Sequence, residues 1–76
     1  MHVTPSVTAA QRVGEAIQAQ MRAVGMSQVY LCSVIGMKQP TLSRKLSGEK
    51  QFLLDELFRI AAALGVSAST FTDAAA

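Results

Sequence analysis

The sequence contains no tryptophan, one cysteine and one histidine in 76 residues, and aromatic residues make up 5% of it. A single cysteine cannot form a disulfide within the chain, and one thiol with one imidazole supplies too few ligands for a structural zinc site. We therefore interpret Cys32 as a small buried hydrophobic residue, which fits a reducing compartment. Because aromatic residues are scarce, the core is expected to consist of aliphatic side chains with Phe52, Phe58 and Phe71, and Tyr30 is a further candidate.

Signals for membrane insertion and for catalysis are also missing. No apolar run approaches the ~20 residues that a transmembrane helix needs. The opening MHVTPSVTAA lacks the basic and apolar regions of a signal peptide, so we expect a cytoplasmic protein. No Gly-rich phosphate loop, Ser-His-Asp arrangement or metal-ligand cluster occurs. Asp55 and Glu56 are adjacent in a predicted helix, which favours helix capping over acid–base chemistry. We predict no enzyme, no cofactor or metal, and no small-molecule ligand.

The net charge is only +2 and does not by itself indicate nucleic acid. The distribution of charge is more informative. Four of the seven cations lie from Lys38 to Lys50, including Arg44 and Lys45, and Glu49 is the one acid among them. A basic patch on an otherwise neutral domain is typical of a small protein that binds operator DNA.

Two short helices joined by a tight turn are predicted from Ser27 to Gly48. Ser27 is a favourable N-cap, and an apolar run with helical spacing follows it. Gly36 interrupts that run where a left-handed residue would end the first helix. Pro40 stands where only the first turn of a second helix tolerates it, because first-turn N–H groups have no intrahelical partner. Helix, glycine turn and helix form a helix-turn-helix, whose second helix enters the DNA major groove.

The second helix, residues 39–46, has two distinct faces. Leu42 and Leu46 share one stripe that must face the core, and Arg44 points almost directly away from it. Polar and basic side chains on the outward face can bind bases and phosphates, although a solvated face with ordinary surface cations stays open as the alternative. The residues predicted to contact DNA are Gln28, Lys38, Gln39, Pro40, Thr41, Ser43, Arg44, Lys45, Ser47 and Lys50.

These predicted contacts differ in kind. Arg44 is the longest donor on the outward face, and we expect it to contact a guanine edge or the adjoining phosphate. Gln28, Lys38 and Lys50 are expected to contact phosphates, which position a protein on DNA without reading sequence. Pro40 cannot hydrogen-bond to a base, but it can pack on a thymine methyl group.

The segment resembles the lambda-repressor/Cro-type helix-turn-helix family, the Xre-like regulators of phages and bacteria. The resemblance extends from about residue 13 to residue 71. It rests on an opening glutamine, a small residue at the helix crossing, a turn glycine and two longer segments: Gln28, Cys32, Gly36, TLSRKLSG (41–48) and DELFRIAAALGVS (55–67). The resemblance implies a sequence-specific transcriptional regulator, a repressor or Cro-like switch protein, acting as a dimer on a pseudo-palindromic operator.

The chain departs from the family pattern at two positions. The family often has an aliphatic residue where Lys45 stands, and here the apolar residue follows one position later, at Leu46. This shift could rotate the second helix and move the base contacts by one residue. Pro40 replaces a residue that in some relatives is polar and reads a base.

Three further helices are predicted around the motif. The first covers about residues 8–24, where apolar residues recur at intervals of four, four and three, and Gly25 ends it. The fourth begins at residue 53 or 54 and ends at 64, and Ser67 caps a short turn at 70–72 that places Phe71 on the core. Segments 1–7 and 73–76 are expected to be loose ends. The fold class is all-α: a compact five-helix, lambda-repressor-like domain from residue 8 to 72.

Some apolar residues remain after the core is filled. Val29, Tyr30 and Val34 project at least partly outward on the first motif helix, and Leu54 and Phe58 can lie outside the buried stripe of the fourth. Scattered surface hydrophobes are common, but we favour a dimer interface at Phe52, Leu54 and Phe58. The resemblance supports this choice, because small relatives dimerise through this part of the fold. The homodimer would be firm only on DNA.

Two functions follow. The first is a regulator that binds double-stranded DNA through its major groove. The alternative is a protein-interaction module with the same fold, such as an antitoxin or an adaptor that binds another regulator.

Overall fold

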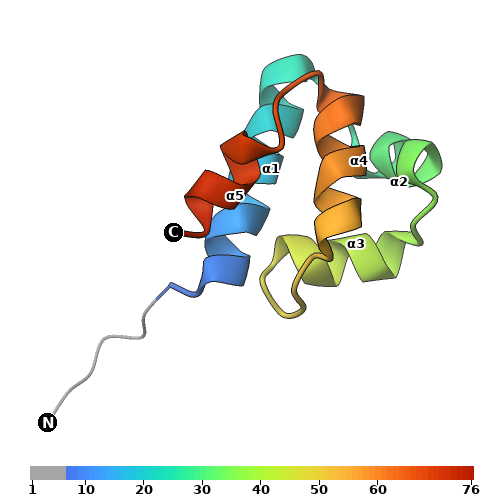
Figure 1. Ribbon diagram of the computed structural model, residues 1–76. Coiled ribbons are helices and arrows are strands. Elements are labelled where there is room, and N and C mark those ends of the chain that lie inside the picture. The colour runs from blue at the N-terminus through green and yellow to red at the C-terminus, as the bar shows by residue number, and fades with distance from the viewer. Residues whose placement is uncertain (1–6) are drawn as a thin grey trace, which may run out of the picture.

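Five helices follow one another along residues 7–76, the part of the chain that the computed structural model describes (Figure 1). They are α1 (Ala9–Val24), α2 (Gln28–Ile35), α3 (Gln39–Leu46), α4 (Leu54–Leu64) and α5 (Ser69–Ala74). No strand occurs among these residues, so the all-α, five-helix prediction is confirmed. In Figure 1, α4 stands between α2 on one side and α1 with α5 on the other, and α3 crosses near the start of α4.

Local signals in the sequence set most helix ends. The Thr8 hydroxyl accepts a hydrogen bond from the Gln11 backbone N–H at 3.1 Å, and the Gln11 side chain accepts one from the Thr8 N–H at 2.8 Å. This reciprocal capping box begins α1 at Ala9. Ser27 caps α2 by accepting from the Tyr30 N–H at 3.1 Å. Gly36 ends α2 with φ of 71°, in the left-handed region that favours glycine, as predicted.

The core draws side chains from every helix, and α4 is central to it. Its buried face consists of Leu57, Ile60, Ala61 and Leu64, which recur at helical spacing. The remaining buried apolar residues are Val13, Ile17, Met21, Leu31, Cys32, Ile35, Leu42, Leu46 and Phe71. Cys32 is buried as predicted, and burial raises the pKa of its thiol.

Only one of the four aromatic side chains is fully buried. Phe71 of α5 is 0% exposed, and Phe52 is half-buried against the core. Phe58 and Tyr30 are 56% and 58% exposed, so neither belongs to the core, and both take the outward position that the sequence analysis gave as the other possibility. Phe58 follows Leu57 by one residue and therefore lies about 100° away from the buried stripe of α4.

The C-terminal segment is tied to the start of α1. The Arg12 guanidinium donates to the carbonyls of Ala74 and Ala75, both at 3.1 Å, and to that of Val7 at 2.8 Å. Residues 73 and 74, which the sequence analysis assigned to a loose end at 73–76, belong to α5. Of the predicted loose segment 1–7, residues 1–6 lie outside the described part.

Candidate nucleic-acid interface

Backbone hydrogen bonds close the turn between α2 and α3. The N–H groups of Gly36 and Met37 both donate to the Cys32 carbonyl, at 2.9 and 3.1 Å. This closes the last turn of α2. Three residues separate the end of α2 from the start of α3, which has Pro40 in its first turn. Lys38 is the N-cap of α3 and makes no side-chain cap. The short turn therefore fixes α3 relative to α2, as the helix-turn-helix prediction requires.

One face of α3 is turned away from the rest of the protein. Its exposed residues include Gln39, Pro40, Ser43 and Arg44, and Ser47 follows directly after the helix. The loop residues Lys38 and Lys50 are exposed beside it, whereas Thr41 and Gln28 are half-buried. The fold thus places nine of the ten predicted DNA contacts at the surface, on or beside α2 and α3. Their contact with DNA stays a prediction.

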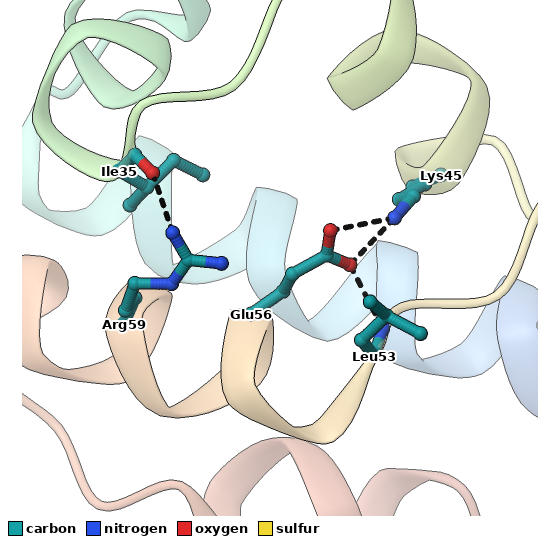
Figure 2. A network of polar contacts seen from close by, with 5 residues as sticks. All are labelled: Ile35, Lys45, Leu53, Glu56 and Arg59. Atoms are coloured by element: carbon teal, nitrogen blue, oxygen red, sulfur yellow. Dashed lines mark hydrogen bonds and ion pairs between the residues drawn. The ribbon is translucent and has the colours of Figure 1, made fainter.

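Lys45 is the exception, because its side chain faces the interior. It is 8% exposed, and its Nζ lies 2.6 and 2.7 Å from the two carboxylate oxygens of Glu56 on α4 (Figure 2). Lys45 is therefore not on the outward face of α3, where its predicted contact with DNA would require it to be. Lys45 comes three residues after Leu42 and shares its inward stripe.

The inward stripe also settles the orientation of α3. Leu42, Lys45 and Leu46 are all buried. Leu46 therefore extends the inward stripe, and position 45 also belongs to that stripe. Position 45 itself thus faces the core. The face around Ser43 and Arg44 remains outward. The stem of Lys45 is long enough to bury its methylenes while its ammonium reaches Glu56.

Glu56, in the first turn of α4, binds two groups. Besides the Lys45 ammonium, it accepts a hydrogen bond from the Leu53 N–H at 2.8 Å (Figure 2). The predicted capping role of Glu56 is thereby confirmed. Burial by itself would raise the pKa of Glu56. The hydrogen bonds from Lys45 and Leu53, with the charges of Lys45 and Arg59, outweigh that effect and lower the pKa below its usual value.

Side chains from α1 and α4 bind the C-terminal carbonyls of the two motif helices. The Gln18 amide donates to the Leu46 carbonyl at 3.1 Å, and the Arg59 guanidinium donates to the Ile35 carbonyl at 3.0 Å. Figure 2 shows the second of these contacts. The last carbonyls of a helix have no intrahelical partner, so these bonds satisfy them. They also attach both motif helices to the scaffold, a role that the sequence did not reveal.

Gly14 permits the close approach of α1 to the end of α3. A Cβ at this position would lie 2.0 Å from the Leu46 carbonyl oxygen, which no side chain allows. Gly14 is buried in the middle of α1, where glycine lacks helix propensity. A glycine inside an otherwise periodic helix was the available signal for this contact.

An apolar stripe remains uncovered on α4. Leu54 and Phe58 are 59% and 56% exposed, and Ala62 continues the stripe at the next helical turn. An open groove between α4 and α5 adjoins Phe58 and includes Ala62 and Val66 in its lining. Of the predicted dimer residues, Leu54 and Phe58 lie on this stripe, whereas Phe52 packs against the core. We call Leu54, Phe58 and Ala62 the α4 stripe.

A second exposed apolar group lies on α2. Val29, Tyr30 and Val34 are all about half exposed or more, as predicted. Elsewhere in residues 7–76, no three His, Cys, Asp or Glu side chains come together to hold a metal ion. No helix in that range is long and apolar enough to cross a membrane.

Comparison with known families agrees with this geometry. A family model described as helix-turn-helix, of the Cro/C1 and Xre-like type, matches residues 17–71. The matched region extends from the middle of α1 to Phe71 and includes both motif helices. Among proteins of curated function, none is similar enough to this sequence to count as a match.

Proposed function

Since the chain belongs to the Cro/C1-type, Xre-like helix-turn-helix family, and so is a DNA-binding regulator, we propose that it is a sequence-specific repressor or Cro-like switch protein. In this proposal, it binds a pseudo-palindromic operator as a homodimer and inserts α3 into the major groove.

The distribution of unengaged cations carries this proposal. Arg12 and Arg59 donate to backbone carbonyls, and Lys45 pairs with Glu56. Among residues 7–76, the cations without such a partner are Arg22 on α1 and three on or beside α3: Lys38, Arg44 and Lys50. Positive charge that the fold does not use is therefore concentrated along the outward face of α3, which is the footprint of DNA binding.

The proposed contacts divide into positioning and readout. Lys38 and Lys50 flank α3 and would neutralise phosphates, together with Gln28 at the start of α2. Arg44 projects from the outward face and would reach guanine through its two-pronged donor group. Because only about three cations per subunit face the DNA, the slope of log affinity against log salt should be close to −3 per subunit, so non-specific binding is modest.

Two copies are needed for useful selectivity. One motif offers a handful of base contacts worth ~1–3 kcal/mol each, too few to single out one site in a genome. Two copies related by a two-fold axis double the contacts and place half-sites about one helical turn apart. The α4 stripe supplies an exposed apolar surface for this pairing. Its area is small, so the free protein would be mostly monomeric and would pair on DNA, where the adjacent half-site raises the effective concentration.

Selection from a pool of randomised duplexes tests the DNA-reading part of the proposal. We expect enrichment of a sequence with two-fold symmetry, and a gel shift in which the wild-type protein prefers this selected duplex to a shuffled one. The exposed residues Val29, Tyr30 and Val34 favour the alternative, a protein-interaction module such as an antitoxin or adaptor. That alternative predicts weak, salt-sensitive binding with no preference between the duplexes.

Phe58→Asp tests the proposed dimer. Phe58 is 56% exposed, so the substitution should leave helical content by circular dichroism unchanged. Cooperative binding to the two half-sites should be lost, whereas binding to an isolated half-site should persist. Val29→Asp, at an equally exposed residue on α2, is the matched control and should retain cooperativity. Cooperative binding by the Phe58 variant would exclude the α4 stripe as the dimer surface.

A further inference from the structure

We propose that the Lys45–Glu56 ion pair is a positioning device for the recognition helix: it fixes the rotation of α3 against α4 and thereby controls how sharply DNA sequences are discriminated, although neither side chain reaches the DNA. The inference rests on the proposed function of α3 as the helix that reads DNA. It assigns to Lys45 and Glu56 a role in specificity that acts through their neighbour Arg44.

The geometry of the pair is restrictive. The Lys45 ammonium contacts both Glu56 oxygens, at 2.6 and 2.7 Å, and one of those oxygens also accepts the Leu53 N–H at 2.8 Å. The bond to Leu53 fixes the Glu56 carboxylate at the start of α4, and the fixed carboxylate in turn binds Lys45 of α3. Both side chains are 10% exposed, so water does not compete freely for these bonds. Bonds of this kind are directional, and they define one position of α3 relative to α4.

The other contacts of α3 leave its rotation less well defined. Gly14 and Gln18 of α1 fix the position of the Leu46 carbonyl, at the end of the helix. Leu42 and Leu46 pack by apolar contacts, which are non-directional and tolerate small rotations. With side chains included, a helix has a radius of about 5–6 Å, so a rotation of about 10° would move the outward side chains by about 1 Å. A displacement of that size is enough to spoil a bidentate hydrogen bond from Arg44.

Stability alone does not account for the pair. Removing two charges from water costs free energy that their attraction repays only partly, and apolar replacements of buried ion pairs are often neutral or stabilising. An aliphatic residue at position 45 would fill the same space. The charged pair therefore stabilises one arrangement over similar ones more than it stabilises the fold as a whole.

The double variant Lys45→Met/Glu56→Gln separates positioning from stability. It conserves net charge, and the glutamine keeps an oxygen that can accept the Leu53 N–H. We expect thermal unfolding at or above the wild-type temperature and an unchanged salt slope, because Lys45 contacts no phosphate. The ratio of affinities for the selected and the shuffled duplex should fall about tenfold, a loss equal to part of one bidentate base contact.

Two outcomes would overturn this inference while the proposed function stands. One is an unchanged affinity ratio in a folded double variant, which would make the pair purely structural. The other is a salt slope lowered by about one, which would mean that Lys45 reaches a phosphate. If Lys45→Met/Glu56→Gln does not fold, Lys45→Met/Glu56→Leu provides the same comparison with an apolar pair. A wild-type protein that shows no preference for any duplex would overturn the proposed function and this inference with it.

Discussion

The two faces of α3 are constrained very differently within eight residues. On the inward face, Leu42 and Leu46 are buried, and Lys45 is bonded to Glu56. On the outward face, Ser43 and Arg44 are exposed and have no side-chain partner among residues 7–76. The inward face determines where the helix lies, so the outward face is free to vary in chemistry without cost to the fold.

Constraint on the inward face comes from two sides. α1 approaches the end of α3 so closely that Gly14 cannot carry a side chain, and the Gln18 amide binds the Leu46 carbonyl. α4 contributes a charged bond through Glu56. A substitution on this face should therefore change stability or helix placement, whereas one on the outward face should change DNA binding alone. The following predictions test that contrast in order of decreasing effect.

Gly14→Ala should have the largest effect. The added Cβ would lie 2.0 Å from the Leu46 carbonyl oxygen, so α1 and α3 must separate. We expect a loss of ~3 kcal/mol in the free energy of unfolding, measured by urea titration, at the upper end of overpacking costs. Gly25→Ala is the matched control. Gly25 has a φ of 70° and open space around it, so the added Cβ meets no other atom. The free energy of unfolding should fall by only ~1 kcal/mol, the cost of a left-handed backbone for a residue with a side chain. Equal losses would contradict the close helix contact.

Arg44→Ala should weaken DNA binding by the outward face of α3 without changing the packing of the inward face. If Arg44 reads guanine, the variant should lose ~1–3 kcal/mol of affinity for the selected duplex and relax the preference at one base pair. Its free energy of unfolding should stay within ~0.5 kcal/mol of wild type, because the side chain is exposed. Gel shifts with duplexes mutated at single positions provide the measurement. Unchanged affinity in the folded variant would remove Arg44 from the DNA interface.

Acid should weaken the inward face through Glu56. Its pKa in the folded protein lies below its ordinary value of 4.5, so the ionised form stabilises the fold. That contribution is complete above about the ordinary value and is lost as pH falls through the lower, folded pKa. The free energy of unfolding, measured from pH 7 to pH 2, should therefore decline at acidic pH. The decline should be shallower in Glu56→Gln than in the wild-type protein. The same decline in both proteins would exclude Glu56 as a source of acid sensitivity.

Lys50→Ala should have the smallest effect. Lys50 is exposed in the loop after α3, and its loss removes one phosphate contact. The salt slope should decrease in magnitude by about one, and affinity for selected and shuffled duplexes should fall equally. A loss confined to the selected duplex would show that Lys50 reads a base instead.

Local signals in the sequence accounted for the helices and their order. Ser27, Gly36 and Pro40 act through backbone geometry and capping within a few residues, so their effects do not depend on distant packing. Apolar periodicity identified Ile17, Leu42 and Leu57 as inward for the same reason. Together these features were enough to predict the helix-turn-helix and the exposed position of Arg44.

Tertiary structure decided the environments that depend on a second helix. Lys45 is a cation in a basic segment, so the sequence alone indicates a DNA contact. Only the approach of Glu56 from α4 makes its burial favourable. The roles of Gly14 and Arg12 cannot be deduced from α1 alone. Gly14 lies against the end of α3, and Arg12 donates to a carbonyl at the end of α5. Whether a charged or small residue is buried depends on partners far away in the chain, because desolvation is offset only by a group that packing brings within bonding distance.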